Sequence, residues 1–167
     1  TPPPDTKKPL KMYISRSFDV NKPGTPIAQL QGGVLGGSIV QGTLSLGQKV
    51  EITPGVNGSP FQLEVASLNI SAGPLSFAHP GGLIAVGTKL DPGITSMDKM
   101  KGQIICEPNT LPPPIERFRM EWHELPRLLG EKLPFPHVEE LMVFTIATNT
   151  LVGEVMFVKK NLLEIQL

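Results

Sequence analysis

The sequence predicts an all-β protein built from two small domains, and three observations lead to this prediction. Apolar and polar residues alternate with the period of a β-strand in several short runs, for example at Leu10, Met12 and Ile14. Glycine (17) and proline (18) make about a fifth of the chain, and they fall between these runs as turns. The runs follow one another at spacings of roughly 8–12 residues, which is typical of a sandwich or barrel.

The chain opens with a segment that predicts a linker followed by a strand. Residues 1–9 hold four prolines and show no apolar periodicity, so we expect an extended linker with a further domain before it. Residues 10–19 alternate and predict the first strand. The turn that follows carries Pro23 and Gly24 where a type I or II turn favours them.

Residues 32–55 are the stretch around which we expect the first domain to be organised. Seven of these 24 residues are glycine, yet Val34 and Leu44 are typical of strands. Gly42 and Gly47 predict turns. A strand lined by glycine indicates that something approaches its backbone closely, either another strand at a barrel corner or a ligand.

Further alternating runs complete the two predicted domains. In the first domain, residues 10–110, we expect about six strands, of which the later ones lie in residues 61–70, 83–86 and 102–106. Three consecutive prolines at positions 112–114 then mark a second linker. In the second domain, residues 111–167, we expect a turn or helical piece at residues 125–130. We also expect about four strands there, in residues 117–122, 141–145, 154–158 and 162–167. Because a closed barrel usually needs more strands, we expect this domain to be incomplete at its C-terminus.

Composition and one glycine motif argue against two function classes, although a shaped pocket for one end of a nucleic acid stays open. Lys and Arg (15) balance Asp and Glu (15), which argues against a general nucleic-acid binder driven by a basic field. Gly42 and Gly47 have the spacing of a P-loop, but Gln48 and Lys49 replace the lysine and hydroxyl residue that such a loop requires. We therefore expect this chain neither to bind nor to hydrolyse GTP.

Other single residues carry no recognisable chemistry. The three histidines lack the spacing of metal ligands, so no metal site is expected. Ser38 lacks the glycine that follows the serine of a nucleophile elbow. Cys106 is the single cysteine, which indicates a reducing, cytoplasmic compartment. No signal peptide and no apolar run of about 18 residues is present, so no membrane association is expected.

Three longer motifs carry a family resemblance. The sequence RSFDVNKPG spans residues 16–24, GGVLGGS spans residues 32–38, and GGLIAVGTKLDP spans residues 81–92. In this order they resemble domain II of the gamma subunits of translation initiation factor 2, which belong to the elongation factor Tu-like GTPases. RLLG at residues 127–130 and ELMV at residues 140–143 are similar to domain III of the same family.

The resemblance implies a domain II-like β-barrel over residues 10–110 and a smaller, incomplete domain III-like barrel over residues 111–167. The family carries GTP and magnesium in an N-terminal G domain. We expect that domain and the last barrel strands to be absent here, and therefore expect neither enzyme activity nor a cofactor. The family factor is a heterotrimer that delivers methionyl initiator tRNA to the small ribosomal subunit in its GTP state.

Partners and site residues follow from the same resemblance. Domain II in this family helps hold the 3′ end of the tRNA and docks the alpha subunit, whereas the beta subunit binds the G domain. The resemblance places these residues at the tRNA pocket: Arg16, Val34, Gly36, Gly37, Leu83, Val86 and Gly87. For the alpha subunit, we expect Asp91 and Asp98 to offer charge to a basic surface. Binding of this chain alone to tRNA is expected to be weak, because its formal charge is zero.

Each of these sites has an alternative that the sequence leaves open. The glycines of residues 32–37 can simply relieve crowding at a barrel corner, and Arg16 can pair locally with Asp19. Residues 81–88 can be a plain core strand, and residues 90–99 a solvated loop. The alternative function is a binding module of another translational GTPase, such as a selenocysteine-specific elongation factor. A third alternative, that the chain is an enzyme domain, has less support, because no acid, base and nucleophile cluster in the sequence.

Overall fold

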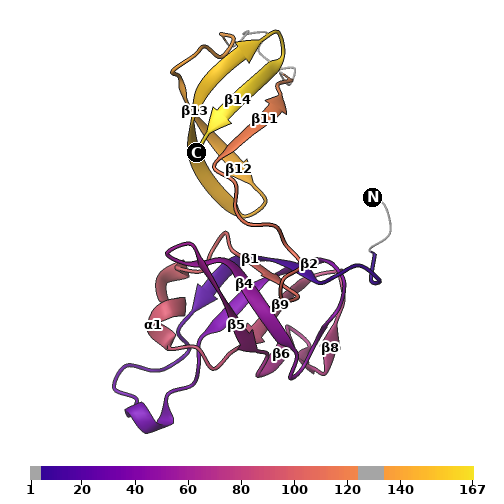
Figure 1. Cartoon of the computed structure of the whole chain (residues 1–167). Coiled ribbons are helices and arrows are strands. Elements are labelled where there is room, and N and C mark those ends of the chain that lie inside the picture. The colour runs from indigo at the N-terminus through magenta and orange to yellow at the C-terminus, as the bar shows by residue number, and fades with distance from the viewer. Residues whose placement is uncertain (1–4, 124–133) are drawn as a thin grey trace. The chain divides into compact units, whose positions relative to one another are not determined.

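The structure is a computed structural model that describes residues 5–123 and 134–167. The chain divides into two compact units, Thr1–Pro113 with Ala147–Asn149 and Pro114–Ile146 with Thr150–Leu167. Figure 1 shows both units and labels most of their strands. The helical piece predicted at residues 125–130, which includes the RLLG motif, lies outside the described residues.

The first unit consists of short strands joined by tight turns. Its strands are β1 (Lys11–Phe18), β2 (Val34–Gln41), β3 (Leu44–Ser45), β4 (Lys49–Val56), β5 (Ser59–Glu64), β6 (Ser67–Ile70), β7 (Gly73–Leu75), β8 (Phe77–Ala78), β9 (Leu83–Gly87) and β10 (Ile104–Cys106). Its helical pieces are η1 (Ile27–Gln29), α1 (Pro92–Thr95) and η2 (Ser96–Asp98). The all-β prediction is confirmed, although the strands are shorter and more numerous than expected.

Eight of these strands form one antiparallel sheet in the order β5-β4-β10-β1-β2-β9-β6-β7, and β3 pairs with β8. Residues 61–70, which we predicted as one strand, are divided between β5 and β6. The Val65 amide donates to the Gln48 carbonyl, whereas the Ala66 amide donates to the Gly87 carbonyl. The backbone therefore changes its pairing partner between these two residues, and this change divides the run.

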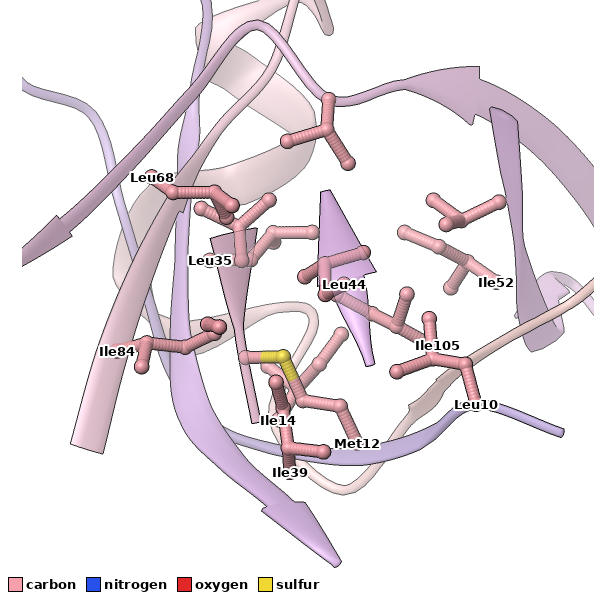
Figure 2. Packing of buried hydrophobic residues seen from close by; sticks show 14 of the residues in the cluster. Leu10, Met12, Ile14, Leu35, Ile39, Leu44, Ile52, Leu68, Ile84 and Ile105 are labelled. Carbon is pink, nitrogen blue, oxygen red and sulfur yellow. The ribbon is translucent and has the colours of Figure 1, made fainter. Parts of the chain in front are cut away.

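The core of the first unit is made by the inward-facing side chains of its strands. Met12 and Ile14 of β1, Leu35 of β2 and Ile52 of β4 are all fully buried (Figure 2). Their period of two is the period of the strand, so one face of each strand supplies the core. Burial of each such side chain contributes on the order of 1.5–3 kcal/mol.

The second unit is a four-stranded antiparallel sheet in the order β11-β14-β13-β12. Its strands are β11 (Arg117–Glu121), β12 (Leu141–Ile146), β13 (Asn149–Lys159) and β14 (Leu162–Gln166). Val155, Leu163 and Ile165 form its buried centre, and the Phe118 and Phe144 rings meet edge to face with centroids 6.0 Å apart. The four strands predicted after residue 114 are confirmed. Closure of a barrel in either unit stays a prediction.

Candidate functional site

The outer face of β1, β2 and β9 brings together most of the residues that the motifs singled out. Strand pairing sets Gly36 between Arg16 on β1 and Ala85 on β9. Two residues earlier on β2, Val34 lies in the same way between Phe18 of β1 and Gly87 of β9. The next strand, β6, pairs with β9 and extends this face. The result is a surface whose middle is lined by small side chains and by backbone.

A β-bulge turns Arg16 to this outer face. The register of β1 against β2 shifts between Ile14 and Arg16, so that Ser15 is the additional residue. Ile14 is fully buried, and strict alternation would send Arg16 inward with it. The bulge instead leaves Arg16 exposed and turns Ser17 into the interior, where it is 2% exposed.

The two glycines of β2 have different reasons to be glycine. A Cβ on Gly37 would overlap the Tyr13 carbonyl oxygen and would lie 2.9 Å from its carbonyl carbon, because this glycine faces inward where the backbone of the neighbouring strand β1 approaches closely. A Cβ on Gly36 would meet the Phe18 ring at 3.5 Å, which is an ordinary contact. Crowding therefore requires Gly37, whereas Gly36 keeps the outer face shallow.

The predicted tRNA-pocket residues do not all reach this face. Arg16, Val34, Gly36 and Gly87 lie on it, as does Leu83, which pairs with Ser38 at its far end and is 72% exposed. Gly37 and Val86 face the interior, and Val86 is fully buried in the core. Their part in any pocket would be limited to the backbone that they contribute to the strands.

A hollow of about 500 Å³ adjoins the surface at Leu83. Phe77, which is 60% exposed, and His79 line it together with the backbone of the glycines at residues 81 and 82. Sequence reasoning missed Phe77 and His79, because neither belongs to a motif. It also missed Phe18, which the i, i+2 spacing from Arg16 could have indicated.

Arg16 is held by the segment that follows β9. Its Nε donates to the Asp98 carboxylate, with both oxygens at 2.9–3.0 Å, and its guanidinium lies 5.5 Å from the centroid of the Phe18 ring. The predicted local alternative, a pair with Asp19, does not form, since Asp19 instead accepts from the amide groups of Asn21. Arg16 therefore stands between the outer face and the segment of residues 90–99, which contains Asp98.

Residues 90–99 are held by specific hydrogen bonds, although several of them remain exposed to solvent. Asp91 caps α1, because its carboxylate accepts from the Gly93 amide at 2.7 Å. Thr95 is fully buried, and its hydroxyl lies 2.9 Å from the Phe18 carbonyl, to which it donates. These contacts tie the segment to β1.

Asp98 is the second anchor of this segment. Its carboxylate accepts from the Ser17 amide at 2.9 Å in addition to Arg16. The backbone hydrogen bond from Ser17, followed by the bond from Arg16, holds the pKa of Asp98 below its ordinary value of 3.8. Both acidic residues predicted for docking therefore have structural partners, and Asp98 keeps 33% of its side chain exposed.

The second unit carries one charged cluster of its own. Glu164 is only 8% exposed and pairs with Arg117 and, at 2.7 Å, with the Nε of Arg119. The hydrogen bond from Arg119 holds the pKa of Glu164 below its ordinary value of 4.5, with Arg117 adding to the effect. The cluster joins β11 to β14, which is a structural role.

The described residues carry neither a metal-ligating cluster nor a membrane-spanning helix. In residues 5–123 and 134–167, no three His, Cys, Asp or Glu side chains gather where they could hold a metal ion. Across the same parts of the chain, no helix has both the length and the apolar character needed to cross a membrane. Cys106 is fully buried, and burial raises the pKa of its thiol.

Comparison with known proteins finds relatives that match nearly the whole chain. No family model matches the chain. Over 98% of its length, it is 41% identical to translation initiation factor 2 subunit gamma of Methanopyrus kandleri, of which it covers 42%. Over its whole length it is 42% identical to the same subunit of Pyrococcus abyssi and 41% identical to that of Aeropyrum pernix, and it covers 44% of each. The chain is homologous to part of translation initiation factor 2 subunit gamma.

The match to translation initiation factor 2 subunit gamma confirms the resemblance inferred from the motifs. The chain spans less than half the length of these relatives. The alignments cover the second unit as well as the first, since they extend over 98–100% of the chain. The name of these relatives is that of the first of the two functions that the motifs left open.

Proposed function

We propose that this chain is a non-catalytic part of translation initiation factor 2 subunit gamma that helps hold the 3′ end of methionyl initiator tRNA and docks the alpha subunit. The observation that carries the proposal is identity of 41–42% along 98–100% of the chain to subunits of that name. GTP and magnesium belong to the family's G domain, through which the beta subunit also binds. The whole factor acts on the small ribosomal subunit.

The outer face of β1, β2 and β9 has the chemistry that a single-stranded RNA end requires. Gly36 and Ala85 leave the backbone accessible between the flanking side chains, so a nucleotide can approach closely. Phe18 offers an aromatic face, and Arg16 beside it offers a positive charge to phosphate. Leu83 and the adjoining hollow supply apolar surface at the far end.

This surface is a guide for the tRNA end and not a strong binding site by itself. The formal charge of the chain is zero, so the non-specific attraction to phosphate is small. Arg16 already pairs with Asp98, which lowers the charge that it can offer to RNA. We expect the G domain to form the other wall of the pocket and to supply the missing affinity.

The alpha subunit is the partner that we propose this chain holds without the G domain. The alpha subunit would dock on the segment of residues 90–99 of this chain. Hydrogen bonds of Asp91 and Asp98 fix that segment, and the Asp98 carboxylate is partly exposed on it. A basic partner surface would complement that carboxylate. Charges at the rim of an interface act mainly on association rate and salt dependence, whereas truncation of a desolvated pair costs about 2–5 kcal/mol.

Calorimetry with purified alpha subunit at two salt concentrations tests the docking site. Asp98→Ala should weaken binding well over tenfold if the carboxylate becomes buried in the interface, or flatten its salt dependence if it lies at the rim. Glu64→Ala is the matched control, since Glu64 is an exposed acid on β5 that pairs only loosely with Lys89, at 4.0 Å. Absence of any binding by the unchanged chain would show that the partner is wrong. Normal binding by Asp98→Ala would show that the segment is wrong.

A further inference from the structure

Met97 is the most exposed methionine that the structure describes, and its backbone conformation is unusual. Its side chain is 85% exposed, whereas Met12 and Met100 are 0% and 1% exposed. Met97 has φ 56° and ψ 38°, and the next residue, Asp98, has φ 58°. Two successive residues other than glycine therefore occupy the left-handed region, which costs roughly 1–2 kcal/mol for each.

The hydrogen bonds around Met97 explain how this conformation persists. The Asp98 carboxylate accepts from the Ser17 amide and from Arg16, and the Met100 amide donates to the Ser17 hydroxyl at 3.1 Å. Met100 itself is buried in the core of the first unit. Asp98 and Met100, which follow Met97, and Thr95, which precedes it, are thus all anchored to β1. The anchored turn leaves the Met97 side chain in solvent.

We propose that Met97 is a site of reversible oxidation by peroxide, and that its sulfoxide weakens the docking of the alpha subunit; this second part rests on the function proposed above. A thioether sulfur in solvent is open to attack, whereas the buried sulfurs of Met12 and Met100 are shielded. The sulfur gives an electron pair to one peroxide oxygen, an S–O bond forms as the O–O bond breaks, and the other oxygen leaves as water. The thioether is oxidised and hydrogen peroxide is reduced.

The position of Met97 connects this chemistry to docking. It lies within residues 90–99, immediately before the carboxylate that we propose the alpha subunit contacts. A partner that covers Asp98 would also cover much of the neighbouring thioether. The sulfoxide is polar, so its burial would forfeit the apolar contribution of the methionine, which corresponds to a loss in affinity of roughly tenfold or more.

The first experiment measures the order of oxidation in the full chain. The protein is treated with increasing hydrogen peroxide, and peptide mass spectrometry follows the sulfoxide at each methionine. Met97 should react first, ahead of Met156 at 41% exposure and far ahead of Met12 and Met100. Reaction at Met97 no faster than at Met100 would overturn the proposal.

The second experiment measures docking by calorimetry before and after oxidation. The oxidised chain should bind the alpha subunit roughly tenfold more weakly, and treatment with methionine sulfoxide reductases should restore the affinity. Met97→Leu keeps an apolar side chain and should make binding resistant to peroxide, whereas Met156→Leu, on β13 of the second unit, should leave the sensitivity unchanged. Equal binding by the oxidised and unoxidised chains would overturn the regulatory part. Failure of the unoxidised chain to bind would instead contradict the proposed docking, while the order of oxidation would still be decided.

Discussion

Gly37→Ala tests whether the close approach of the β1 backbone, and not ligand binding, requires the inward glycine of β2. The added Cβ would overlap the Tyr13 carbonyl oxygen and lie 2.9 Å from its carbon and 3.2 Å from the Ile14 Cα. All three atoms belong to backbone, so no side-chain rotation relieves the overlap. β2 would have to move away from β1 along a ladder that runs from Lys11 to Phe18.

The magnitude follows from the cost of forcing an extra carbon into a packed interior. Such overpacking typically costs about 1–3 kcal/mol, and we expect about 3 kcal/mol here because the backbone must move. For a domain of this size that loss corresponds to a fall in melting temperature of roughly 10–20 °C. Gly36→Ala is the matched control, since its Cβ would be 3.5 Å from the Phe18 ring and its stability should change by less than about 1 kcal/mol.

Thermal unfolding followed by circular dichroism gives the difference in stability, and hydrogen exchange locates it. Gly37→Ala should raise exchange in β1 and β2 and leave the second unit unchanged, because that sheet has its own core. Equal stability of the two variants would refute the reasoning.

On the outer face, Gly36→Ala should weaken tRNA binding by the complete gamma subunit without unfolding it, since the methyl group occupies the surface that we propose the nucleotide approaches.

Three further predictions concern the hydrogen bonds of the two units. Thr95→Val leaves the Phe18 carbonyl without its buried donor and should lower the free energy of unfolding by about 1–3 kcal/mol in denaturant titration. Asp98→Asn should make the first unit less stable than in the unchanged protein above pH 3.8. Because the folded-state pKa of Asp98 is lowered, this difference in stability should shrink as pH falls below that value. It should be absent once the wild-type carboxyl is protonated. Glu164→Gln should lower the stability of the second unit alone. The difference in stability from the wild type should be full above pH 4.5 and should be lost at lower pH. Unchanged hydrogen exchange across β11 and β14 would contradict this prediction.

Much of the fold could be predicted from local patterns. The alternation of Met12 and Ile14 indicated which face of β1 is buried, and the turns at Pro23-Gly24 and at Gly47 separated the strands correctly. The division of residues 61–70 could not be predicted, because the same alternation fits one long strand or two short ones. Only the change of hydrogen-bond partner after Val65 distinguishes the two.

The candidate site shows the same limit more sharply. The motifs indicated that Arg16, Gly36 and Leu83 belong to one surface, and strand pairing places them on one face. The motifs also indicated Val86, whose side chain the structure buries in the core. Alternation from Leu83 could have indicated this, since Val86 is an odd number of residues away and so faces the opposite side of β9.

The sequence by itself determined the class of fold, the alternating core and the resemblance to the family, because side-chain period, turn residues and long motifs are local properties of the chain. Tertiary structure alone decided that a bulge at Ser15 turns Arg16 outward, that Asp98 holds it from 82 residues away, and that Met97 is left in solvent. These features depend on which distant backbone groups pair with one another. A local pattern records which residues face inward, but it does not record which strand or carboxylate meets them.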